Sequence, residues 1–369
     1  MRDELDSLDV NILEGLGKSG PRNISEVARM LGIPRGTMLS RIKRMSSFFY
    51  LRMSANVYHT NLGLKKAVVF AKAALGYEDL LFDCMKVNKF YIYLSRCYGR
   101  FEGCFGIYVI PKDHTAEFQQ FVQELKKLVA SDIEVYWSTC FHTVNRTSNW
   151  FDRLSKTWVF PWDKWIEEIQ TQALELPFTL VDPADFPIKA DEMDLFILKE
   201  LEKDATISLT TIAKKLGTTL QTVHRHYQMH LIKRGLIEAF QTFIFPFERA
   251  ISDTFFFVFK FDSREKMVKF ALSLLEKPFV YTLGKVLDQN AIIVHIYLPR
   301  PEFRMFIENL SKLVRTGFLQ SYDYLIQDLS LGKWSRQTIP YEFFKDGSWI
   351  YNHHEHVKNL QDLTHQYVL

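Results

Sequence analysis

Basic side chains concentrate in two stretches of the sequence that contain no carboxylate. No Asp or Glu lies between Glu26 and Glu78, and none lies from Ala205 to Ile237, although Lys, Arg and His residues occur throughout both stretches. Basic charge concentrated in structured segments favours a polyanionic partner, and nucleic acid is the commonest one. The alternative is a solvated basic surface without a partner.

Residue patterns that carry catalytic chemistry are missing from the sequence. There is no phosphate-binding loop, no GxSxG, no HExxH and no CxxC pair. The run from His353 to His356, together with His365, could hold a metal, but a solvated or helical tail is the preferred interpretation. The four cysteines lack metal-ligand spacing and are expected to be reduced core residues. We therefore predict no enzyme, no catalytic or metal-binding residue and no cofactor.

The basic stretches belong to two copies of a three-helix pattern. Asp9, Leu13 and Gly32 in the first copy recur in the same order as Asp194, Leu198 and Gly217. In each copy apolar residues follow helical spacing, and the glycine can end the second helix. Two helices across a short turn, the second with a basic outer face, predict a helix-turn-helix.

The outward face of each third helix, with one residue after it, supplies the candidate DNA contacts. In the first copy these are Arg35, Thr37, Ser40, Arg41, Lys43, Arg44 and Arg52. In the second copy they are Gln221, Thr222, His224, Arg225 and Gln228.

These segments resemble the Lrp/AsnC family of archaeal and bacterial regulators. The resemblance rests on Leu5 to Asp9, on the run ISEVARMLGIPRGTMLSRIKRM, and in the second copy on IAKKLG followed by Arg234 to Ile237. The second copy departs from the first at His226, which stands where the first has Arg41. The resemblance implies a sequence-specific, double-stranded DNA-binding transcription regulator with winged helix-turn-helix domains.

Alternating strand and helix patterns follow each of these domains in the order βαββαβ. The first set runs from Ala67 to Phe141 and the second from Phe255 to Ile326, which predicts two ferredoxin-like domains. They are similar to the family's ligand-sensing and assembly domain. That resemblance implies a pocket for an amino acid or other small metabolite at Gly99 and Glu102, and at Gly284 and Asp288. The alternative is that these glycines only satisfy tight hairpins.

A competing interpretation comes from siroheme decarboxylases, which are enzymes and resemble this arrangement of paired modules. Such chemistry would require histidine and arginine side chains that converge in the cavity of the sheet. The candidates are His59, Arg96, Arg100 and His142, which are scattered along the sequence without a motif.

The 369 residues, with 47% hydrophobic composition and a net charge of +3, fit a multidomain globular protein. The fold class predicted is α+β, with the duplicated halves forming a pseudo-dimer within one chain. We expect a cytoplasmic protein, a homo-oligomer as one option and no membrane partner, since the acidic start is unlike a signal peptide. The predicted divisions are winged helix-turn-helix domains at 1–60 and 191–247, ferredoxin-like domains at 61–145 and 248–330, a Trp-rich extension and linker at 146–190, and an aromatic, His-containing extension at 331–369.

Overall fold

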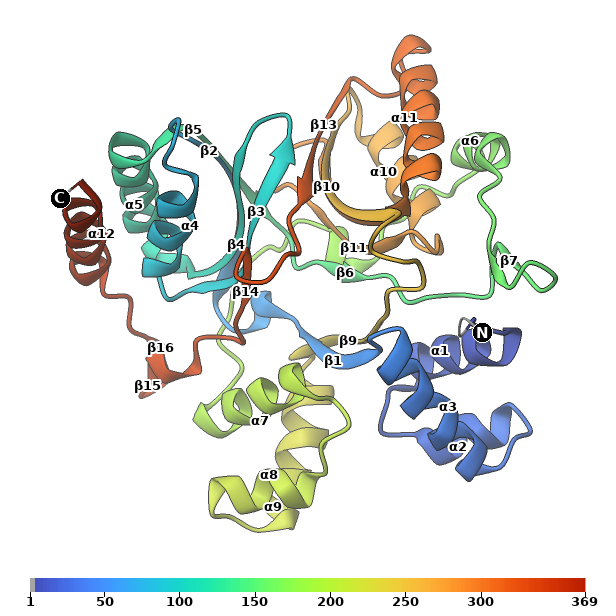
Figure 1. Ribbon diagram of the computed structural model, residues 1–369. Helices are drawn as coiled ribbons and strands as arrows, with labels where there is room; N and C mark the ends of the chain where they lie inside the picture. The colour runs from blue at the N-terminus through green and yellow to red at the C-terminus, as the bar shows by residue number, and fades with distance from the viewer. Residues whose placement is uncertain (1–3, 369) are drawn as a thin grey trace.

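The computed structural model describes residues 4–368 and has an α+β architecture. Two helical heads lie on one side of two α/β layers, and a short sheet lies between the heads (Figure 1). This arrangement confirms the predicted fold class of two winged helix-turn-helix and two ferredoxin-like units in tandem. Residues 1–3 and 369, the outermost positions of the first and last predicted divisions, lie outside the described residues.

The first head contains α1 (Ser7–Ser19), α2 (Ile24–Met30), α3 (Arg35–Phe48) and the wing strand β1 (Arg52–Val57). A capping box starts α1, because the carboxylates of Asp6 and Asp9 each accept the other residue's backbone N–H. Met38 and Met45 of α3 lie on one face of the helix and are fully buried.

The second head contains α7 (Glu192–Lys203), α8 (Leu209–Leu216), α9 (Leu220–Arg225) and the wing strand β9 (Ile237–Phe243). Asp191, Ser208 and Thr219 cap the three helices, and Gly217 takes the left-handed conformation that ends α8. A π-helical segment, His226–Ile232, continues α9.

Two βαββαβ units follow the heads. The first consists of β2 (Leu64–Ala73), α4 (Glu78–Val87), β3 (Tyr91–Gly99), β4 (Gly103–Pro111), α5 (Thr115–Leu128) and β5 (Ala130–Ser138). The second consists of β10 (Ser252–Lys260), α10 (Arg264–Leu274), β11 (Val280–Lys285), β12 (Ala291–Pro299), α11 (Arg300–Arg315) and β13 (Ser321–Gln327). In both units the element order matches the order predicted from the sequence.

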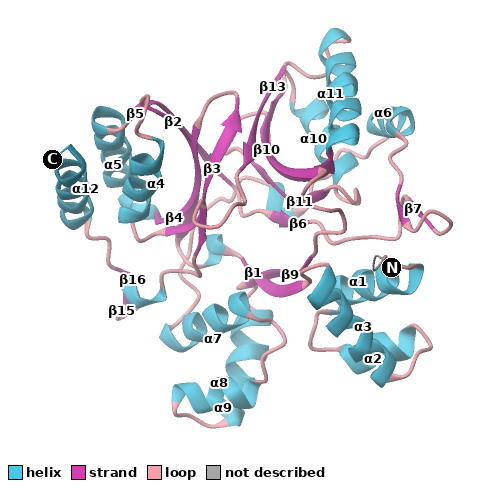
Figure 2. Ribbon diagram, viewed as in Figure 1, coloured by secondary structure: helices cyan, strands magenta, loops and turns pink. Residues whose placement is uncertain are grey.

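Strand pairing joins the two halves of the chain. The two wings form one antiparallel sheet, in which β1 pairs with β9 (Figure 2). The βαββαβ units share one sheet of ten strands, because β3 pairs with β13 and β6 (His142–Thr143) pairs with β11. The helix-free faces of the two units pack against each other, where Phe105 stacks on Phe256 with ring centroids 3.7 Å apart.

Smaller elements cover the outer helices. A hairpin of β7 (Phe151–Asp152) and β8 (Thr157–Trp158) leads to α6 (Trp162–Gln170), which packs on α10 and α11. Strand β14 (Trp334–Arg336) pairs with β3, and a second hairpin, β15 (Phe344–Lys345) with β16 (Ser348–Trp349), precedes α12 (His353–Val368). Helix α12 packs on α4 and α5. Trp158, Trp162 and Trp165 are buried, as expected for aromatic side chains that join modules.

The four cysteines are buried and free. Among the described residues, no helix has both the length and the apolar character that a membrane crossing requires.

Candidate functional site

A cavity of about 260 Å³ lies between the wing sheet and the two facing halves of the large sheet. Its walls come from β1, β2, β3 and β4 of the first half and from β9, β10, β11, β12 and β13 of the second. Neither half of the chain could therefore build it alone.

The floor of the cavity carries a histidine and a lysine from the first half. His59 follows β1 in a short 3₁₀ turn and is only 2% exposed. Neither of its ring nitrogens has a hydrogen-bond partner among the described residues. Burial, assisted by the charge of Lys66, holds the pKa of His59 well below its usual value. Lys66 is also buried, its Nζ atom lies 4.3 Å from the centre of the Phe141 ring, and burial lowers its pKa.

A second histidine comes from the other half of the chain. His295 stands opposite Phe256 in the β10–β12 register, and the two rings stack 4.5 Å apart. Its Nε2 atom lies 3.1 Å from Oε1 of Gln327. Burial lowers the pKa of His295 to about 3. Nearby, the buried hydroxyl of Thr254 has no partner in the described part of the chain.

Arginines surround the mouth of the cavity. Arg52, Arg249 and Arg336 are exposed, and none of them makes an ion pair within residues 4–368. Among the described residues that line the cavity, Glu202 alone carries a carboxyl group, and burial raises its pKa to about 7. The lining is therefore strongly cationic.

One more buried cation lies near His295, although it does not line the cavity. Arg146 is 2% exposed, and its guanidinium makes no hydrogen bond in the described structure. The guanidinium lies 4.4 Å from the centre of the Tyr281 ring, and its charge helps to lower the pKa of His295. Buried polar groups without partners are rare in proteins and need an explanation. The unpartnered groups of His59 and Thr254, together with the arginines at the mouth, suit an anionic ligand that accepts hydrogen bonds.

Most of the predicted DNA contacts are exposed side chains, whereas two arginines form ion pairs within the protein. Those that are exposed are Arg35, Thr37, Ser40, Lys43, Arg52, Gln221, His224, Arg225 and Gln228. Thr222 is half-buried, and its backbone N–H donates to the capping Thr219.

Arg41 and Arg44 of α3 face the start of α1 rather than open solvent. Arg41 pairs with Asp6 at 2.5 Å and with Asp9 at 3.0 Å, and Arg44 also pairs with Asp9, which is fully buried. These two arginines neutralise a buried carboxylate and fasten α3 to α1.

The predicted small-metabolite residues do not line the cavity. A Cβ atom at Gly99 would lie 3.0 Å from the carbonyl oxygen of Tyr324, and one at Gly284 would lie 2.4 Å from the Phe141 ring. Both glycines thus have a packing reason to be there. Glu102 pairs with Arg96 at 3.6 Å, and Asp288 lies in the exposed β11–β12 turn.

Only one of the four residues weighed for an enzyme lies in the cavity. His59 lines it, whereas Arg96 pairs with Asp79, Arg100 pairs with Glu134, and His142 bonds to Thr179. Sequence reasoning missed His295. A histidine in the middle of the apolar strand sequence AIIVHIYL was the signal that could have identified it.

Comparisons with known proteins give two kinds of likeness. Residues 191–228, in the second head, match the AsnC-type helix-turn-helix domain. The crystal structure of the siroheme decarboxylase NirDL superposes with a TM-score of 0.56 at 10% identity, covering 98% of this chain and 99% of that one. Its complex with an iron-uroporphyrin III analogue gives 0.50 at 11% identity, covering 97% and 98%.

A shorter protein is also similar to part of the chain. An AsnC family transcriptional regulator from Agrobacterium tumefaciens, at 18% identity, covers 36% of this chain and 89% of its own length with a TM-score of 0.30. None of the curated proteins matches the sequence.

The prediction that the chain is not an enzyme is wrong. Two structures that match it over nearly its whole length are those of an enzyme, so a catalytic protein shares this fold. The prediction relied on local sequence motifs, which cannot reveal side chains that meet from distant strands, as His59 and His295 do.

Proposed function

We propose that the chain is an enzyme that removes carboxylate groups from an anionic tetrapyrrole of the siroheme type. The observation that carries this proposal is the pair of buried histidines, His59 and His295, in one cavity whose mouth bears three arginines. The likeness to NirDL supports the choice of ligand, because that protein is a siroheme decarboxylase.

The cavity residues have properties that suit this reaction. Loss of CO₂ from a carboxylate leaves an electron pair on carbon, which a proton must take up to give the product. Guanidinium groups such as those of Arg52, Arg249 and Arg336 bind carboxylates through paired hydrogen bonds. A histidine can then supply the proton, as a general acid does.

Protonation of the histidines would depend on the ligand. The lowered pKa values of His59 and His295 leave both rings neutral at pH 7 in the free protein. An anion bound beside them favours the charged form and raises their pKa values. Binding of the ligand's carboxylate would therefore favour protonation of the histidine that then acts as the general acid.

The size of the cavity limits how the ligand lies. Pockets for small molecules usually enclose about 300–1,000 Å³, and this cavity encloses about 260 Å³. A macrocycle must therefore extend into the mouth, where Arg249 and Trp334 are exposed. Only the part nearest the floor would meet the histidines.

Absorbance titration with siroheme tests the proposal. We expect a spectral shift on binding, followed by a product that mass spectrometry shows to be lighter by one CO₂ for each carboxylate removed. His59→Gln and His295→Gln should keep the spectral shift and lose at least 100-fold in rate, a typical effect for a general acid. His365→Gln, on the exposed face of α12, is the matched control. Absence of both shift and product would refute the proposal.

Regulation through sequence-specific binding of double-stranded DNA is a second candidate function. The match of residues 191–228 to the AsnC-type helix-turn-helix domain favours it. The exposed polar face of α9, with Gln221, His224 and Arg225, gives this head side chains that suit a DNA groove. Control of that binding by an amino acid at Gly99, Glu102, Gly284 and Asp288 stays a prediction.

Selection from random DNA duplexes tests this second function. Phosphate contacts make affinity fall with salt, with a slope of about 0.9 per contact. Arg35→Ala with Lys43→Ala should lower that slope by about two, since both side chains are exposed and lie outside the ion pairs of α3. Recovery of no enriched duplex would exclude the function.

A further inference from the structure

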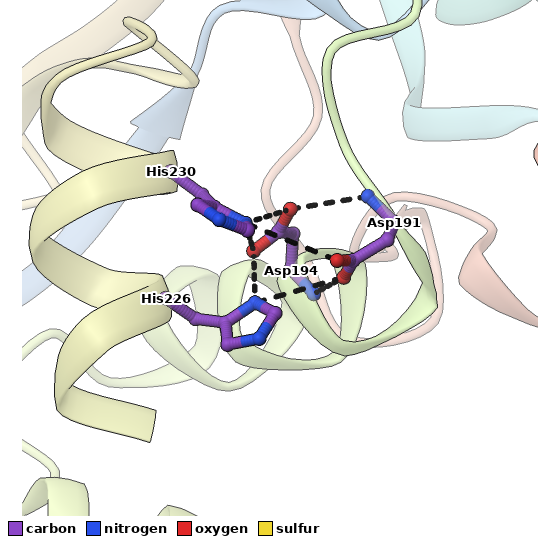
Figure 3. A group of neighbouring side chains, drawn as sticks. All are labelled: Asp191, Asp194, His226 and His230. Atoms are coloured by element: carbon purple, nitrogen blue, oxygen red, sulfur yellow. Dashed lines mark hydrogen bonds and ion pairs between the residues drawn. The ribbon is translucent and has the colours of Figure 1, made fainter. Parts of the chain in front are cut away.

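Four potential metal ligands meet in the second head, and none of them is among the residues that line the cavity. Asp191 and Asp194 lie at the start of α7, and His226 and His230 belong to the π-helical segment that continues α9 (Figure 3). One ligand atom from each of the four lies within 4.8 Å of the others. It is the sole such group found within residues 4–368.

The distances between these atoms suit a tetrahedral ion. Zinc binds nitrogen and carboxylate oxygen at about 2.0–2.2 Å, so two ligands of a tetrahedral site lie about 3.4 Å apart. Nδ1 of His226 and Nδ1 of His230 lie 2.7 and 3.1 Å from one oxygen of Asp194, Oδ1. The distances to Asp191 are 3.7 Å from His226 to Oδ1 and 3.8 Å from His230 to Oδ2. Changes of up to about 0.7 Å in these separations would bring one ligand atom from each residue around one ion.

The backbone orients both carboxylates. Oδ1 of Asp191 accepts the N–H of Asp194 at 2.9 Å, and Oδ2 of Asp194 accepts the N–H of Asp191 at 3.1 Å. This capping box fixes the two side chains. Oδ1 of Asp194, which takes no part in the capping box, faces Nδ1 of both histidines, and Oδ2 of Asp191 lies 3.8 Å from Nδ1 of His230. Such outer hydrogen bonds are what orient ligands in metal sites.

The π-helical turn brings the two imidazoles together. His226 and His230 are four residues apart, their ring centroids are 4.4 Å apart, and both Nδ1 atoms face the same buried carboxylate. Short π-helical segments within α-helices occur often at functional sites.

In the first head arginine side chains neutralise the equivalent carboxylates. There Asp6 and Asp9 form the equivalent capping box, and the guanidinium groups of Arg41 and Arg44 pair with them. A guanidinium is permanently charged and has no lone pair for a metal. In the second head His226 stands where the first head has Arg41, and His230, which aligns with Met45, also reaches the carboxylate of Asp194. No arginine pairs with these carboxylates in the described structure, so a divalent cation can supply the positive charge.

We propose that Asp191, Asp194, His226 and His230 bind a zinc ion. With four protein ligands the site is closed, which is typical of structural rather than catalytic zinc. Two nitrogen ligands argue against Ca²⁺ and Mg²⁺, which prefer oxygen. Asp194 is fully buried and His226 is 8% exposed, while Asp191 is 45% exposed and leaves a route for the ion. Zinc would fasten α7 to the helix that follows α8.

Calorimetric titration of the metal-stripped full-length chain with Zn²⁺ tests the site. We expect one ion per chain, a raised unfolding temperature, and, with Co²⁺ as the probe, the visible absorption of a tetrahedral complex. A chain that binds no Zn²⁺, or whose Co²⁺ complex lacks that absorption, would overturn the proposal.

Two variants make the result specific. His226→Arg with His230→Arg reproduces the ion pairs of the first head, so this variant should fold without metal and bind Zn²⁺ at least about 100-fold more weakly. His353→Ala with His354→Ala removes a pair of adjacent histidines at the start of α12, which are not part of the proposed site, and should leave Zn²⁺ binding unchanged. Binding that persists in the first variant or disappears in the second would place the ion elsewhere.

Discussion

At the scale of single residues, burial of His295 makes stability depend on pH in a definite direction. The unfolded chain protonates this imidazole below about pH 6.5, whereas the folded chain does so only near its pKa of about 3. The unfolded state thus binds more protons in between, and the free energy of unfolding falls as the pH drops through this interval. The contribution is about 1.4 kcal/mol per pH unit.

Urea unfolding of a His295→Gln variant at pH 7, 6, 5 and 4 measures this effect. Below pH 6.5 the wild type should lose about 1.4 kcal/mol more per pH unit than the variant, while groups common to both, such as Glu202, cancel. The exposed His365→Gln variant should follow the wild type. If the free energy of unfolding changed equally with pH in the wild type and in His295→Gln, His295 would not be buried in its neutral form.

Sequence reasoning identified individual residues only where local pattern was enough. Helical periodicity, which the sequence shows, accounts for the buried Met38 and Met45 of α3. In the second head helical periodicity does not hold as far, and the side chain of Met229 is 47% exposed. The π-helical segment changes the spacing after Arg225, and no residue type announces such a segment. The same change brings His226 and His230 onto one carboxylate.

At the scale of elements, the contact between β11 and the chain around β6 depends on a glycine. In Gly284→Ala the new methyl group would lie 2.4 Å from the Phe141 ring, which also lines the cavity. Overpacking of this kind costs about 1–3 kcal/mol. Gly36→Ala in α3 is the matched control, because its Cβ would meet nothing within 4 Å, and it should be neutral or stabilising.

Denaturant unfolding of both glycine variants distinguishes packing from ligand binding at Gly284. A loss of stability without any change in amino-acid binding assigns this glycine to strand packing. If Gly284→Ala is as stable as Gly36→Ala but no longer binds an amino acid, the predicted effector site is supported instead.

The order of elements was accessible from the sequence, but their pairing was not. Alternating patterns predicted both βαββαβ units, because strand and helix periods are local. The pairing of β1 with β9 and of β3 with β13 joins segments that are far apart in the chain. Since the cavity lies among these strands, its combination of His59 with His295 could not be read from the sequence.

At the scale of the whole molecule, the two halves share their cores. One hydrophobic core combines Val69 and Phe118 of the first βαββαβ unit with Leu198 of the second head. Another joins Leu13 of the first head to Ile244, which follows the second wing. The described structure is therefore not two half-chains that fold separately and then associate.

Expression of the halves as separate chains tests this interleaving. A break after Glu175 falls in an exposed segment between α6 and the second head, where a cut should be tolerated. Because each half alone would expose unpaired strand edges and large apolar faces, residues 1–175 alone should aggregate or unfold at a much lower temperature. Co-expressed halves should purify as a one-to-one complex, measured by light scattering. If residues 1–175 alone folded and had the same unfolding temperature as the intact chain, the interpretation of shared cores would be contradicted.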